Sequence, residues 1–109
     1  MLTSVAFDTR TDITVLSVAG DVDIAVTPDL RAAIDETLAL GAATLVIDLA
    51  QVTFMDSSGI SALVKGRVAA DVAGTGFQLR NVPPPVRRVL EITGSVDYLG
   101  GMAADSAMA

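Results

Sequence analysis

Residues 45–61 read LVIDLAQVTFMDSSGIS, and this stretch decides the fold. Its first part, Leu45–Leu49, is a nearly continuous run of branched apolar residues, interrupted by Asp48, that is typical of a buried strand. A helix-patterned segment follows the serines, so two hydroxyls, one carboxylate and one glycine lie where a strand gives way to a helix. In α/β proteins the sheet presents its chemistry at such junctions. Backbone N–H groups and the helix dipole favour an anion there, so a serine at this position is well placed to carry a phosphate.

The composition indicates one compact domain over residues 1–109. The chain is 51% hydrophobic, and no apolar run approaches the ~20 residues of a membrane span. The N-terminal residues lack the basic and apolar regions of a signal peptide. Without cysteine there is no disulfide framework. We therefore expect a cytoplasmic protein with no direct membrane binding.

The charge balance narrows the class of partner. Seven basic residues stand against 13 acidic ones, which gives a net charge of −6. Nucleic acid requires a basic face and is not expected as a partner, whereas an acidic surface favours a basic protein. The chain has no histidine and no cysteine. It therefore lacks the commonest general base, the thiol nucleophile and most transition-metal ligands, and we expect no enzyme activity, no cofactor and no metal.

Three further strands are predicted around the central run at residues 43–49, which we expect to be covered on both faces. Ser4–Phe7 and Ile13–Val18 read as strands joined by a polar turn, which favours a hairpin. Residues 19–23 (AGDVD) read as a loop, because glycine and aspartate dominate turns. Phe77–Leu79 is a short strand farther along the chain.

Three helices are predicted from the apolar spacing. The first begins at Thr27–Pro28, with a hydroxyl cap and a proline at the first helical position, and ends at Gly41. The second follows the serines and ends near Gly74, and the third begins at the prolines 83–84 and ends at Gly94. The residues expected to form the apolar stripes are Leu30, Ala33, Ile34 and Leu38, then Ile60, Leu63, Val64 and Val68, then Val86, Val89 and Leu90. The order ββαβαβα predicts an α/β domain with a mixed sheet of about four to five strands and helices packed on it.

The Asp56–Gly59 segment has a structural and a functional interpretation. Aspartate or serine at a helix N-terminus accepts a backbone hydrogen bond, so one of these residues is expected to be a cap. Gly59 lowers helix propensity in a first turn, which favours the close approach of another molecule to the backbone. The residues alone leave both interpretations open.

Three enzyme-like alternatives find little support in the sequence. A nucleophile elbow requires a glycine two positions before the serine, which the chain lacks, and a serine–lysine pair would have to use Lys65, about two turns along the same helix. Asp48 at the end of a strand suggests a phospho-receiver, but Asp8 has no acidic neighbour and no lysine follows Lys65. Residues 74–77 (GTGF) lack the third glycine of a dinucleotide-binding loop.

Several segments together resemble the STAS domain and, more narrowly, bacterial anti-sigma factor antagonists. The resemblance covers a core of about residues 3–99 and leaves residues 100–109 as a tail expected to be flexible. Asp21 and Val22 depart mildly from the family, which more often has glutamate and leucine there. The segments that carry the resemblance are GDVD at 20–23, TPDL at 27–30, LVIDL at 45–49, FMDSSGI at 54–60, NV at 81–82 and VRRVLEITG at 86–94.

The resemblance implies a regulatory binding protein. In that family an unphosphorylated antagonist binds an anti-sigma factor, which is also a serine kinase, and so frees the sigma factor for transcription. The kinase then phosphorylates the second serine of the motif, here Ser58, and the complex dissociates until a serine phosphatase removes the phosphate. The residues that the match places at the partner contact are Asp21, Asp23, Asp56, Ser57, Ser58 and Gly59.

Two other roles for such a domain stay open on the sequence. One is a STAS scaffold subunit of a large stress-signalling assembly, and the other is an accessory STAS subunit of a membrane transporter. The chain is expected to be a monomer or a weak dimer, and the sequence does not decide between the two.

Overall fold

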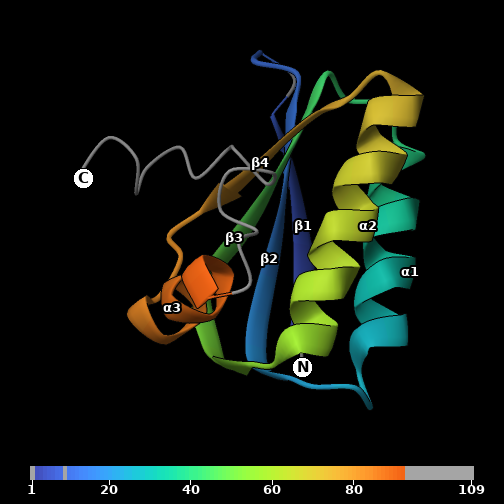
Figure 1. Ribbon diagram of the computed structural model, residues 1–109. Coiled ribbons are helices and arrows are strands. Elements are labelled where there is room, and N and C mark those ends of the chain that lie inside the picture. The colour runs from blue at the N-terminus through green and yellow to red at the C-terminus, as the bar shows by residue number, and fades with distance from the viewer. Residues whose placement is uncertain (1, 9, 93–109) are drawn as a thin grey trace.

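The computed structural model describes residues 2–8 and 10–92, which form a four-stranded sheet and three helices in the order ββαβαβα (Figure 1). The elements are β1 (Leu2–Asp8), β2 (Ile13–Val22), α1 (Thr27–Leu38), β3 (Thr44–Met55), α2 (Ser57–Ala73), β4 (Gly76–Arg80) and α3 (Pro84–Ile92). The predicted fold class and element order are confirmed. The expected helix end at Gly94 and the expected tail at residues 100–109 lie outside the described residues.

The sheet is mixed, with the strands in the order β1-β2-β3-β4. β1 pairs antiparallel with β2, which confirms the predicted hairpin. β2 pairs parallel with β3, and β3 pairs parallel with β4. The carboxyl ends of β2 and β3 therefore lie at the same edge of the sheet, where Val22 pairs with Met55.

All three described helices pack on one face of the sheet (Figure 1). The largest fully buried side chains of the core between them are Leu16, Leu30, Ile34, Leu45, Ile47, Leu49, Leu63, Leu79 and Leu90. The predicted central position of residues 43–49 is confirmed, since β3 lies between β2 and β4. The prediction that this strand is covered on both faces holds at Val46, which points to the face opposite Leu45 and Ile47 and is buried. Farther along that face Asp48 is half-buried and Ala50 is exposed. No helix within the described residues is long and apolar enough to cross a membrane.

β2 is longer than predicted, and the loop expected at residues 19–23 is strand as far as Val22. Glycine and aspartate favour a turn locally, but β3 continues to Met55 and pairs with this segment along its length. Two register shifts accommodate the unfavourable residues, and Gly20 has a φ of 91°. Pairing with a distant strand thus overrides the local preference for a turn.

The predicted cap of α1 is also wrong by one residue. Val26 occupies the N-cap position and makes no side-chain hydrogen bond there. The Thr27 hydroxyl instead donates to the carbonyl oxygen of Ile24 at 3.3 Å. The turn before the helix explains the difference, because the backbone N–H groups of Val26 and Thr27 both donate to the carbonyl oxygen of Asp23. Pro28 is therefore the second residue of α1, one position later in the helix than predicted.

The apolar stripe of α2 is confirmed at Ile60 and Leu63, which are buried, but not at Val68, which is 47% exposed. Small residues take the inward positions beyond Leu63. A Cβ atom added at Gly66 would lie 3.0 Å from Cδ1 of Ile34 on α1. The two helices therefore approach too closely for a large inward side chain, and the valine faces away from the core.

Candidate functional site

The serine motif lies at the junction of β3 and α2, as the sequence predicted. Asp56 is the N-cap of α2 and has an extended backbone, with φ −97° and ψ −175°. Its backbone N–H donates to the carbonyl oxygen of Val22 at 3.2 Å, which joins the start of α2 to the end of β2. Val22 pairs with Met55 at the ends of the two strands. The residues that come next, Asp23 after β2 and Asp56 after β3, therefore lie at the same edge of the sheet.

The Asp56 carboxylate organises the first turn of α2. Its Oδ1 atom accepts hydrogen bonds from the backbone N–H of Ser58 at 2.9 Å and of Gly59 at 3.3 Å. The Ser58 hydroxyl donates to the same oxygen at 2.5 Å. This hydroxyl is the main reason that the pKa of Asp56 is lowered; desolvation acts in the opposite direction, and the two backbone N–H groups add to the lowering. The carboxylate is therefore ionised at neutral pH.

The two serines are presented differently. Ser57 is exposed at the first residue of the helix, while Ser58 is half-buried and oriented by Asp56. Because the Ser58 hydroxyl acts as a donor in that bond, the lone pairs of its oxygen stay available. An anion added to this oxygen would lie at a helix N-terminus, where the dipole and the backbone N–H groups favour it. The geometry suits an oxygen that accepts a phosphoryl group.

Packing explains why residue 59 is a glycine, which the sequence alone did not indicate. The residue is buried, and an added Cβ atom would lie 2.6 Å from Cγ of Met55 and 3.1 Å from Cγ1 of Val22. The glycine is thus required by packing against the protein's own core. The expectation that it leaves space for a second molecule is not needed to explain it.

The two aspartates near the end of β2 hold the local backbone. The Asp21 carboxylate lies on the strand and accepts a hydrogen bond from the Thr53 hydroxyl at 2.6 Å. The Asp23 carboxylate accepts one from the N–H of Ala25 at 3.0 Å and shapes the loop before α1. Asp23 therefore follows β2 at the same edge as Asp56, whereas Asp21 is bound to β3 within the paired strands.

Two exposed apolar side chains near this edge were missed by the sequence analysis. Ile24, directly after Asp23, is 76% exposed, and Phe54, two residues before Asp56, is 50% exposed. The alternation of a strand could have indicated Phe54, because its neighbour Met55 is buried and the two must point to opposite sides. The edge thus combines acidic groups with exposed apolar area.

Asp48, the residue considered above as a phospho-acceptor, forms hydrogen bonds within the fold. Its carboxylate accepts hydrogen bonds from Ala50 N–H at 2.9 Å, Arg80 at 3.2 Å and Asn81 at 3.3 Å. Partial burial acts to raise the pKa of Asp48, but these hydrogen bonds and the Arg80 charge outweigh it and hold the pKa below its ordinary value. Within residues 2–8 and 10–92, no group of three or more histidine, cysteine or acidic residues is placed to hold a metal ion.

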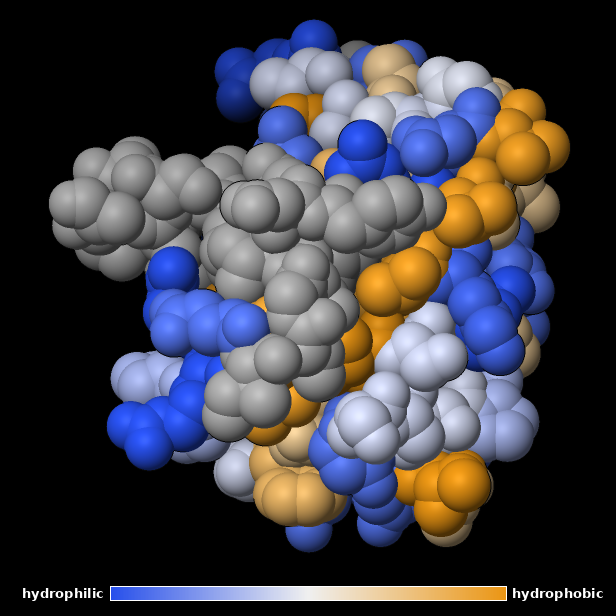
Figure 2. Space-filling view, in the orientation of Figure 1, coloured by the Kyte–Doolittle hydropathy of each residue, from blue (hydrophilic) through white to orange (hydrophobic). Residues whose placement is uncertain are grey.

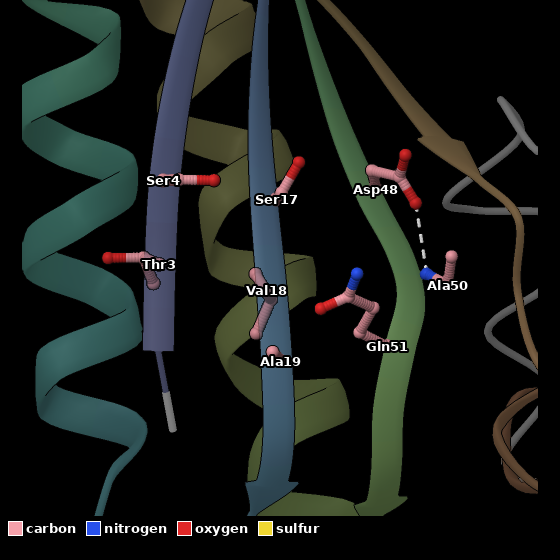
Figure 3. Close-up of a pocket in the computed structure, with 8 residues that line it drawn as sticks. All are labelled: Thr3, Ser4, Ser17, Val18, Ala19, Asp48, Ala50 and Gln51. Atoms are coloured by element: carbon pink, nitrogen blue, oxygen red, sulfur yellow. Dashed lines mark hydrogen bonds between the residues drawn. The ribbon is translucent and has the colours of Figure 1, made fainter.

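A hollow of about 410 Å³ lies between the strands on the side of the sheet that faces the viewer in Figure 3, with α2 behind. It is lined by Thr3, Ser4, Ser17, Val18, Ala19, Asp48, Ala50 and Gln51. A register shift between β2 and β3 lies beside it, next to Ser17. The Asp56–Gly59 segment does not contribute to this lining, so the Ser58 hydroxyl lies outside the hollow.

Comparison with known proteins identifies the family. Over residues 5–100 the sequence matches the family described as Mlab, STAS domain. An anti-sigma factor antagonist from Mycobacterium paratuberculosis is 30% identical to the chain, with a TM-score of 0.83 and coverage of 98% of this chain and 90% of that one. No curated protein sequence gives a significant match.

Two more distant structures share the fold. A putative anti-sigma factor antagonist from Thermotoga maritima has a TM-score of 0.80 at 21% identity, with coverage of 97% of this chain and 91% of that one. The Bacillus cell fate determinant SpoIIAA in its phosphorylated form has a TM-score of 0.67 at 22% identity, with coverage of 98% and 96%. At these identities the likeness concerns the fold alone.

Proposed function

The chain belongs to the STAS domain family, and from this premise we propose that it is an anti-sigma factor antagonist whose partner binding is switched off by phosphorylation of Ser58. The observation that carries the proposal is the Ser58 hydroxyl, held by Asp56 at the N-terminus of α2 and half-buried there. The 30% identity to the Mycobacterium antagonist supports this type of partner. That SpoIIAA has a phosphorylated form supports this type of modification.

In the proposed reaction the chain is the substrate, and the anti-sigma factor acts as the serine kinase. The Ser58 oxygen forms a bond to the γ-phosphorus of ATP, the bond from that phosphorus to the β,γ-bridging oxygen breaks, and the hydroxyl proton is released. The kinase supplies ATP and the positioning groups. This division of roles fits a chain without histidine or cysteine. A serine phosphatase would restore the hydroxyl by hydrolysis.

The charge added at Ser58 gives a physical reason for release. A phosphoserine carries about −1.5 to −2 charges at neutral pH. In the free protein the helix N-terminus and water accommodate that charge. In a complex it would be desolvated beside the ionised Asp56, and like charges brought together at an interface cost several kcal/mol. Binding is therefore lost while the fold of the chain is kept.

The contact surface that we propose comprises the acidic and apolar groups at the carboxyl edge of β2 and β3. Asp23, Asp56, Ser57 and Ser58 supply its polar part, and Ile24 with Phe54 its exposed apolar part. Gly59 supports this surface from inside through its packing on Met55. Asp21 acts indirectly, because its hydrogen bond with Thr53 holds the ends of β2 and β3 together.

Titration calorimetry with the cognate anti-sigma factor tests the proposal. We expect Ser58→Asp to weaken binding at least ~100-fold, which corresponds to about 2.7 kcal/mol, with an unchanged circular dichroism spectrum. Ser4→Asp is the matched control, since Ser4 is an exposed serine on β1 in the lining of the hollow, and its affinity should equal that of the parent. Equal affinity of Ser58→Asp and the parent would contradict the charge switch.

The same proteins distinguish the two other roles that the sequence left open. A scaffold subunit would form large particles in sizing experiments at increasing concentration. A transporter subunit would co-purify with an ATPase, and Ser58→Asp would not disturb that complex. Either result, combined with absent binding to the anti-sigma factor, would overturn the proposed function.

A further inference from the structure

The Asp56 carboxylate and the Ser58 hydroxyl share one end of α2 and cannot keep their present contact once Ser58 is phosphorylated. The Ser58 Oγ and Asp56 Oδ1 atoms lie 2.5 Å apart, and the serine hydroxyl donates its proton to the carboxylate. This separation is typical of a charge-assisted O–H···O⁻ hydrogen bond, which requires the proton. In phosphoserine the Oγ atom is an ester oxygen and carries no proton. One of the two side chains must therefore move away from the other.

Two backbone N–H groups in the first turn of α2 are the groups for which the carboxylate and a phosphate would compete. The N–H of Ser58 donates to Asp56 Oδ1 at 2.9 Å, and the N–H of Gly59 donates to it at 3.3 Å. The Gly59 N–H also donates to the carbonyl oxygen of Asp56 at 3.1 Å. The Ser58 N–H therefore depends most on the carboxylate. Because a phosphoryl group would be bonded to Ser58 Oγ, its oxygens would start beside the acceptor that these N–H groups now use.

The phosphoryl group is the stronger of the two competing acceptors. It carries about −1.5 to −2 charges at neutral pH and has three strong acceptor oxygens, whereas the carboxylate carries a single charge. Both anions are favoured by the dipole at the N-terminus of α2, and the more highly charged one is favoured more. The two anions also repel each other. The N-terminus of α2 therefore favours the phosphate over the Asp56 carboxylate.

The Asp56 side chain can leave the cap while its backbone stays in place. The backbone N–H of Asp56 donates to Val22, and its carbonyl oxygen accepts from Gly59 and Ile60. Figure 2 shows hydrophilic and weakly polar side chains at the end of the molecule where α2 begins, with apolar ones beside them. A carboxylate that turns outward there enters water. From this competition we propose that phosphorylation exchanges the cap of α2: the phosphoryl group on Ser58 takes over the backbone N–H groups, and the Asp56 carboxylate turns outward into the surface that contains Asp23.

The cap exchange deepens the proposed function and rests on it, since it takes Ser58 as the phosphorylated residue. It adds a second change to the contact surface, because the released Asp56 carboxylate joins the phosphate and Asp23 there. The fold is kept, since α2 exchanges one cap for another and the packing of Gly59 on Met55 is not touched. Release of a partner therefore requires only a side-chain rearrangement at one end of a helix.

A crystal structure of the full chain with phosphoserine inserted at position 58 during translation tests the exchange directly. We expect a phosphoryl oxygen within hydrogen-bond distance of the backbone nitrogen of Ser58 or Gly59, and no hydrogen bond from either nitrogen to the Asp56 carboxylate. An Asp56 Oδ1 atom that still accepts from Ser58 N–H would overturn the proposal. Because no kinase is used, that result would leave the kinase reaction at Ser58 to be judged separately by mass mapping.

Urea unfolding tests the exchange in solution. Asp56→Ala should lower the unfolding midpoint of the unmodified chain, because it removes the cap, but not that of the phosphorylated chain, in which Asp56 no longer caps. Asp48→Ala is the matched control, since its partners Arg80 and Asn81 lie away from α2. It should lower the midpoint equally in both forms. A loss of the same size for Asp56→Ala in both forms would overturn the cap exchange.

Discussion

Asp48 lies on β3 and Asp56 directly follows it, and the two carboxylates have different environments. Each carboxylate accepts the backbone N–H of the residue two positions later at 2.9 Å, and the pKa of each is lowered. Asp48 is neutralised by Arg80 at 3.2 Å. Asp56 has a side-chain hydroxyl, that of Ser58, as its main partner.

The difference separates a structural carboxylate from one that can take part in regulation. The partners of Asp48 are an arginine, an amide and a backbone N–H, and their hydrogen bonds hold β3 to the end of β4. The principal partner of Asp56 is a hydroxyl that would lose its proton on phosphorylation. The negative charge of Asp56 would then face the negative charge of the phosphate on Ser58. We therefore expect substitutions of Asp48 to change mainly stability, and substitutions at Asp56 and Ser58 to change mainly binding.

The largest effect on stability is expected for Asp48→Ala. This change removes hydrogen bonds from Ala50, Arg80 and Asn81. Losing hydrogen bonds to a charged group costs about 2 kcal/mol, and the Arg80 part is small because that side chain is 39% exposed. Urea unfolding should therefore show a lower midpoint with an unchanged slope. Affinity for the anti-sigma factor should stay within about twofold of the parent, a difference of ~0.4 kcal/mol; a large loss of affinity would contradict the comparison.

A smaller effect on stability is expected for Asp56→Ala, which removes the N-cap of α2. Asn caps a helix about as well as Asp, so Asp56→Asn should unfold close to the parent. Comparing the alanine and asparagine variants separates the effect of the cap from the effect of the charge. Urea unfolding measures the stability of both variants. If the alanine and asparagine variants were equally destabilised, the cap would not be the structural role of Asp56.

The smallest expected effect is a change in one pKa. Ser58→Ala removes the main cause of the low pKa of Asp56, so that pKa should rise toward the ordinary value, while the pKa of Asp48 should not move. A carboxyl with a lowered pKa stabilises the fold above its unfolded pKa of about 4, and this stabilisation is lost as the pH falls through the folded pKa. Carboxyl NMR titration measures both groups in one experiment. Equal shifts of Asp48 and Asp56 would contradict the assignment.

Local patterns sufficed for much of the fold and for the position of the motif. The run at residues 43–49, the proline in the first turn of α1 and Gly74 at the end of α2 each act through neighbouring residues. The position of the serines at the β3–α2 junction was predicted from the same kind of local pattern. The element order and the mixed sheet were therefore predicted correctly.

The errors arose where distant residues decide the structure. Gly20 and Asp21 favour a turn, but they pair with β3 more than 30 residues later. The Asp48–Arg80 pair spans a similar separation and was missed. Val68 was expected on the apolar stripe of α2, but the close approach of Ile34 to Gly66 leaves it facing outward. Such contacts have no signature in a local pattern.

Mapping the phosphate after incubation with the cognate anti-sigma kinase and ATP tests the central claim most directly. Intact-mass spectrometry with fragment analysis should find one added phosphoryl group on the parent chain, located on Ser58, and none on Ser58→Ala. Ser57→Ala should still accept the phosphate. If Ser58→Ala gains a phosphoryl group as readily as the parent, Ser58 is not the regulated residue.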